Sequence, residues 1–80
     1  MITEYEYFIC VDIKNGTPVL LYTSKDGSYI EDRYNRIKRE KEYFNVEGVK
    51  KEDVLAVSLC VAKYYYGRQV STECLRRVAL

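Results

Sequence analysis

Residues 5–14 alternate between two faces with a period of two residues, and this alternation limits the fold more than any other part of the chain. One face carries only apolar side chains: Tyr5, Tyr7, Ile9, Val11 and Ile13. The other face is mainly charged, with Phe8 and Cys10 among the charges. Successive side chains of a β-strand point to opposite faces, so residues 5–14 are predicted to form a strand buried on one face.

The Asn15-Gly16 pair predicts a hairpin directly after this strand. Both residues tolerate the positive φ that a two-residue type I′ turn requires. That turn would pair Val11 with Leu20, which keeps apolar side chains together on one face. Pro18 cannot donate a ladder hydrogen bond, so the second strand is predicted to lie at an edge of the sheet.

A helix is predicted from about residue 29 to residue 44. Ser28 and Glu31 have the spacing of a capping box, in which both side chains accept hydrogen bonds from free backbone amides at the helix start. An apolar stripe at helical spacing follows and comprises Ile30, Tyr34, Ile37 and Phe44. Residues 45–48 are predicted to end the helix.

Residues 54–66 admit two interpretations. As a helix this segment would be apolar on nearly every side. As a strand it places bulky Leu and Val on one face and small Ala, Ser and Cys on the other, and we favour the strand. A type II′ turn at Gly67-Arg68 would then pair Val61 with Cys74 across a second hairpin.

These elements predict one α+β domain over residues 1–80, with a four-stranded antiparallel sheet and one helix packed on one face. The chain order is ββαββ. The predicted strand order is 2-1-3-4, because the second strand lies at an edge and the crossover through the helix should be right-handed.

A single helix covers only one face of such a sheet, so the other face would stay open. Its apolar side chains are predicted to be Phe8, Cys10, Val19, Leu21, Cys60 and Leu75. Monomers rarely expose large apolar patches, so we expect a second copy or a target to cover this face. The alternative is that residues 45–53 or the C-terminal residues fold over it.

The residues of the chain offer little for catalysis. Histidine is absent, which removes the commonest general base and most zinc sites. The three cysteines form no C-x-x-C pair, and we interpret them as buried thiols. Glu4, Glu6 and Asp12 share a strand face and are interpreted as solvated surface. We therefore expect no enzymatic activity, no cofactor and no metal.

The most unusual local sequence is Lys63-Tyr64-Tyr65-Tyr66-Gly67-Arg68. It places aromatic and cationic side chains at a predicted hairpin tip, and we take Lys63, Tyr64, Tyr66 and Arg68 as candidate contact residues. Tyrosine and arginine are enriched at protein interfaces, and they also stack on bases and contact phosphate. The structural alternative is that tyrosines simply favour strands.

The net charge of +1 gives no global attraction to nucleic acid or to membranes, and no apolar run reaches the ~20 residues of a membrane span. The first residues lack a secretory signal pattern, and we expect a complete, cytoplasmic protein. In size, composition and lack of catalytic motifs, the chain resembles small proteins that phages and mobile elements encode against host systems, anti-CRISPR proteins among them. The resemblance implies a non-catalytic, dimeric protein that inhibits or sequesters a host protein or complex. The alternative is a module that binds nucleotides or single-stranded nucleic acid through the hairpin tip.

Overall fold

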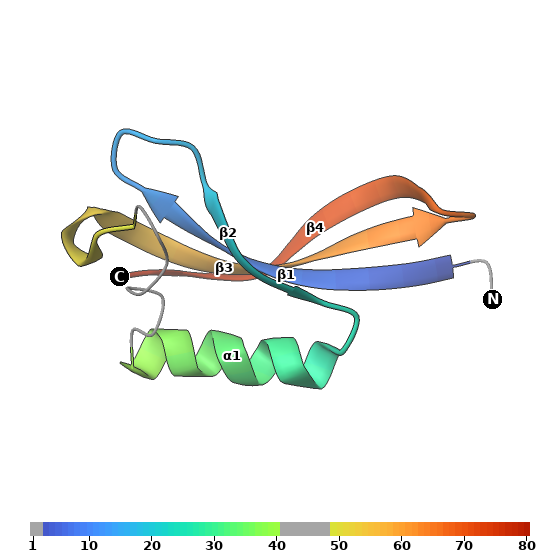
Figure 1. Cartoon of the computed structure of the whole chain (residues 1–80), viewed down its shortest axis with the longest axis horizontal. Helices are drawn as coiled ribbons and strands as arrows, with labels where there is room; N and C mark the ends of the chain where they lie inside the picture. Colours follow the sequence, from blue (N-terminus) through green and yellow to red (C-terminus); the bar gives the residue numbers. More distant parts are fainter. Residues whose placement is uncertain (1–2, 41–48) are drawn as a thin grey trace.

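The computed structural model describes residues 3–40 and 49–80, which form one four-stranded antiparallel sheet and one α-helix (Figure 1). The elements are β1 (Thr3–Ile13), β2 (Val19–Ser24), α1 (Gly27–Glu40), the 3-10 turn η2 (Lys51–Asp53), β3 (Val54–Tyr65) and β4 (Arg68–Ala79). The strand order is β2-β1-β3-β4. The predicted α+β class, chain order and strand order are confirmed, and residues 54–65 are a strand rather than a helix.

Helix α1 packs its apolar stripe against the two central strands. Ile30, Tyr34 and Ile37 are at most 1% exposed and contact a cluster that includes Ile9 and Val57. This is the predicted stripe as far as the structure describes it, because Phe44 and the predicted helix end at residues 45–48 lie outside the described residues. The core therefore follows from the two periodicities of the sequence, 3.6 in the helix and 2 in the strands.

The helix begins two residues earlier than the predicted capping box requires. Asp26, not Ser28, caps the helix: its Oδ1 accepts hydrogen bonds from the amides of Ser28 (3.0 Å) and Tyr29 (3.2 Å). An aspartate at this position satisfies amides that have no partner within the helix. Glu31 is then free of a capping role, and its Oε1 lies 3.0 Å from Nη2 of Arg76 on β4.

The predicted register of the first hairpin is wrong at the turn end. Residues 14–18 form a longer loop, in which Asn15 has a φ of 59°, and β2 begins at Val19. Val19 therefore pairs with Val11, and a bulge at Leu21 restores the predicted pairing further along the strand. A shift of one residue exchanges the faces of a strand. Val19 and Leu21 consequently pack against the core, whereas Leu20 is 56% exposed.

The second hairpin also departs from the predicted register. β4 carries bulges at Leu75 and Val70, so Val61 pairs with Glu73 instead of Cys74. The strands close through Tyr66 and Gly67, whose φ angles are 52° and 77°. Tyr66 and Gly67 lie between the paired residues Tyr65 and Arg68, and two positive φ angles at these positions define a type I′ turn. The predicted type II′ turn at residues 67–68 is therefore wrong.

One end of the sheet extends past the helix. We call it the arm and define it as residues 3–7 of β1, 61–65 of β3 and 68–73 of β4 with the connecting turn (Figure 1). The arm accounts for the elongated shape of the molecule, whose principal extents are 42 × 25 × 21 Å. The start of α1 reaches only the base of the arm, where Gly27 lies against the ring of Tyr7. Beyond that point Tyr5, Tyr65 and Tyr66 are exposed.

Candidate functional site

The turn at the end of the arm holds Tyr66 in a backbone conformation that tyrosine rarely adopts. Its φ is 52°, and its side chain is 69% exposed. Type I′ turns favour Asn or Gly at this position, and a left-handed conformation costs an ordinary residue roughly 1–2 kcal/mol. The ring of Tyr66 meets the ring of Tyr65 edge to face, with centroids 4.7 Å apart. This contact is with another exposed side chain, so Tyr66 contributes little to the core.

The candidate contact residues are divided between the two faces of the arm. Lys63 and Arg68 lie on the face that continues the helix-covered side of the sheet, opposite Tyr5 and Tyr65 respectively. Tyr5 is 47% exposed and Tyr65 is 44% exposed. This face therefore combines exposed aromatic rings with two cations, whereas Tyr64 lies on the other face of the arm.

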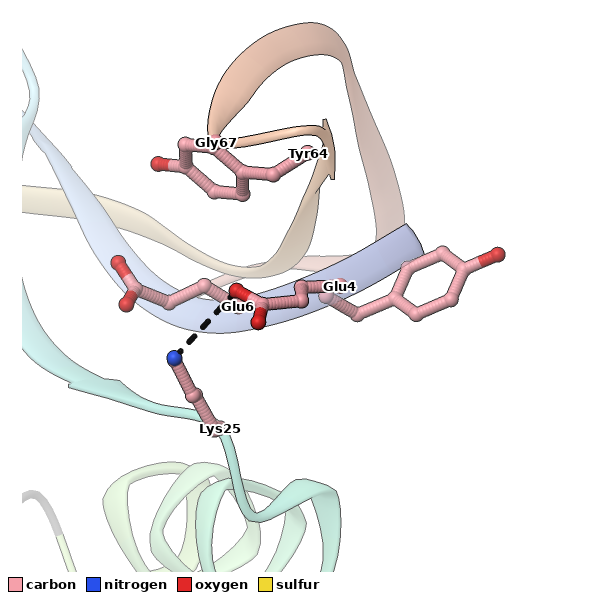
Figure 2. Close-up of a pocket in the computed structure, with 6 residues that line it drawn as sticks. Glu4, Glu6, Lys25, Tyr64 and Gly67 are labelled. Atoms are coloured by element: carbon pink, nitrogen blue, oxygen red, sulfur yellow. Dashed lines mark ion pairs between the residues drawn. The ribbon is translucent and has the colours of Figure 1, made fainter. Parts of the chain in front are cut away.

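Tyr64 borders a shallow cavity on that other face, of about 250 Å³ (Figure 2). Glu4 is directly opposite Tyr64 in the sheet, and Glu6 lies two residues further along β1. Nζ of Lys25 lies 3.5 Å from Oε2 of Glu4, and both side chains are more than half exposed. An exposed pair of this kind is strongly screened by water and contributes little to stability. Glu4, Glu6 and Lys25 leave the cavity with one net negative charge beside an aromatic ring, an arrangement that suits a cation better than a phosphate.

The apolar side chains on the open face of the sheet differ from those that the sequence indicated, because Leu20 pairs with Cys10 and therefore lies on this face. Phe8, Cys10 and Cys60 lie on this face, but Cys60 is already buried, and Val19 and Leu21 belong to the opposite side. Leu75 occupies the bulge in β4 and is 45% exposed.

An ion pair further divides the open face. Nη2 of Arg77 lies 2.8 Å from Oδ2 of Asp12, and Nε of the same arginine donates to the same oxygen at 3.2 Å. Sequence reasoning missed this contact, because it depends on the registers of three strands at once. It places a charged bridge across β3 on this face of the sheet.

The structure adds no sign of a metal centre or a membrane segment. In the part of the chain that the structure describes, no cluster of acidic or cysteine side chains has the geometry to hold a metal ion. Residues 3–40 and 49–80 contain no helix that is long and apolar enough to cross a membrane. No protein-family model, curated protein or solved structure matches the chain.

Proposed function

We propose that this chain is a non-catalytic binding protein that holds a protein partner against the arm and thereby inhibits or sequesters it. The observation that carries the proposal is Tyr66, which is exposed and has an unfavourable φ. A residue in a sparsely populated backbone conformation costs folding free energy, and such residues cluster at functional sites. Because the ring returns little packing energy within the chain, contact with a partner is the function that best accounts for a tyrosine there.

The chemistry of the arm favours a protein over a nucleic acid. Exposed tyrosines with a nearby arginine are the side chains that dominate binding energy at protein interfaces. On the Tyr64 face, Glu4, Glu6 and Lys25 together carry one net negative charge, which gives no attraction to a phosphate backbone. Binding of single-stranded nucleic acid would have to rely on Lys63, Arg68 and the adjacent tyrosines alone. It would weaken steeply with added salt, so a salt titration separates the two proposals.

We further propose that the partner is a cytoplasmic host protein or complex, in keeping with an anti-defence protein of a phage or mobile element. The support is the combination of small size, exposed aromatic side chains and no motif for catalysis. Affinity capture from bacterial lysate tests it. The wild-type chain is expected to retain a partner that a variant with Tyr64, Tyr66 and Arg68 changed to alanine does not retain. Recovery of the same proteins by both chains would remove the arm as the contact surface.

The proposal includes a homodimer. Four leucines outside the arm are about half exposed in the described residues: Leu20 at 56%, Leu55 at 50%, and Leu75 and Leu80 at 45% each. The backbone amide of Leu80 donates to the carbonyl of Leu55 at 2.9 Å, so two of these side chains lie at the same end of the sheet. A second copy would remove this apolar surface from water.

Sedimentation at micromolar concentration is expected to give twice the chain mass of 9.4 kDa. Leu55→Glu should shift the protein to the monomer, because a charge at an apolar interface is costly to bury. The same substitution should leave the circular dichroism spectrum unchanged, since Leu55 is half exposed in the single chain. A wild-type chain that sediments as a monomer and binds no hydrophobic dye would contradict the dimer.

A further inference from the structure

The cysteines are not the separate buried thiols that the sequence indicated. Cys60 is buried, Cys10 is half-buried and Cys74 is exposed. Cys60 on β3 and Cys74 on β4 are direct partners in the sheet register, so their side chains lie on the same face. The proximity of Cys74 contributes to the raised pKa of the Cys60 thiol. This pairing depends on the bulge at Leu75, which shifts β4 by one residue relative to β3. Without the bulge, Cys74 would lie opposite Val61, as the sequence predicted.

The separation of directly paired strand residues suits a disulfide. Partners in antiparallel strands have Cα atoms about 4.5–5.5 Å apart. Disulfides join residues whose Cα atoms lie roughly 4.4–6.8 Å apart, so closure here needs no large movement of the backbone. Sγ of Cys74 donates a weak hydrogen bond to the carbonyl oxygen of Arg76 at 3.4 Å, and closure would break this bond.

We propose that Cys60 and Cys74 form a cross-strand dithiol that closes to an intramolecular disulfide by exchange with a low-molecular-weight disulfide. The thiolate of Cys74 attacks one sulfur of the reagent, and the first reagent thiolate leaves. The thiolate of Cys60 then attacks Sγ of Cys74 in the mixed disulfide, and the second reagent thiolate leaves. The two protons of the cysteines end on the two released thiols. Two electrons pass from the protein to the reagent. The S–S bond of the reagent is broken, and an S–S bond between Cys60 on β3 and Cys74 on β4 is formed.

The order of the two attacks follows from exposure. Burial raises the pKa of the Cys60 thiol to about 12, with a further contribution from the nearby Cys74. Cys60 is therefore a poor first nucleophile, and the reagent meets the exposed Cys74 first. Burial, the largest cause of the raised pKa of Cys60, stays in place after this first step, so the second step depends on the closeness of the two sulfur atoms. The second attack is intramolecular, which favours it over attack by another molecule.

Cys10 provides the internal control. It lies on the same face but pairs with Ser58, not with a cysteine. Burial and the neighbouring Asp12 raise the pKa of its thiol, which makes it less reactive at neutral pH. A Cys10→Ser chain should therefore close its disulfide as the wild type does.

The test is incubation of the reduced full chain with glutathione disulfide, followed by intact mass measurement and peptide mapping. We expect loss of two hydrogen atoms, a peptide linked through residues 60 and 74, and a rise in Tm of about 12–24 °C from the closed loop. Cys60→Ser should instead gain one glutathione at Cys74. Wild-type protein that ends as a stable mixed disulfide, that links through Cys10, or that stays unmodified would overturn the proposal. The outcome does not depend on the proposed function, because no partner takes part in it.

Discussion

Replacing Tyr34 by alanine is expected to lower the free energy of unfolding by about 3–5 kcal/mol. Tyr34 is 1% exposed and is the largest fully buried side chain in the described residues. It lies at the centre of α1, and its ring faces the β1–β3 core formed by residues such as Ile9 and Val57. Removing the ring deletes apolar contacts and leaves a cavity that the surrounding strands cannot close. A small domain is stable by only about 5–15 kcal/mol, so the variant would lose a large fraction of its stability.

Urea denaturation of the wild type, Tyr34→Ala and Tyr29→Ala measures this effect. Tyr29 is the matched control, because it lies on the same helix but is 42% exposed. Its ring lies 5.4 Å from the guanidinium of Arg33, a surface contact worth about 0.5–1 kcal/mol. Equal losses for the two alanine variants would mean that α1 does not pack on the sheet as described.

The second large effect concerns Tyr66. Tyr66→Asn is expected to raise the free energy of unfolding by about 1 kcal/mol, because Asn-Gly is the preferred sequence for a type I′ turn. Loss of the edge contact with Tyr65 offsets part of this gain. The same substitution is expected to weaken partner binding by about 2 kcal/mol, or roughly 30-fold, as for an interface hot spot.

Thermal unfolding checks the stability half of this prediction, with Tyr65→Asn as the control. Tyr65 is the last residue of β3, where asparagine is disfavoured, so its replacement should not raise Tm. A gain of 1 kcal/mol corresponds to about 4–8 °C for a domain of this size. If Tyr66→Asn and Tyr65→Asn lower Tm alike, the backbone at residue 66 is not strained and the argument for a functional tyrosine fails.

Periodicity predicted the elements of this fold, but it could not predict the strand registers. The stripe of Ile30, Tyr34 and Ile37 identified the helix, because helical spacing is a local property of the sequence. The bulges at Leu21 and Leu75 are different, since they depend on how two strands fit together. A one-residue error was enough to exchange the faces of Val19 and Leu20, and with them much of the predicted open patch.

The sequence predicted which residues lie at the hairpin tip, but it did not predict which face of the sheet each of them occupies. The run of tyrosines correctly indicated an exposed hairpin tip, but neighbouring strand residues point to opposite faces, so Tyr64 is separated from Lys63 and Arg68. The strain at Tyr66 was not visible because Gly67 fits either a type II′ turn with Arg68 or a type I′ turn with Tyr66. The Cys60–Cys74 pair was missed for a related reason, since it exists only in the bulged register.

The proposal rests most directly on what Tyr66 does for binding, and comparative affinity capture measures it. Equal amounts of wild type, Tyr66→Asn and Tyr29→Ala are immobilised, and the proteins retained from bacterial lysate are quantified by mass spectrometry. We expect the wild type and Tyr29→Ala to retain the same partner and Tyr66→Asn to retain at least about tenfold less, although it is the more stable chain. Equal retention by Tyr66→Asn and the wild type would contradict a role for this tyrosine in partner contact.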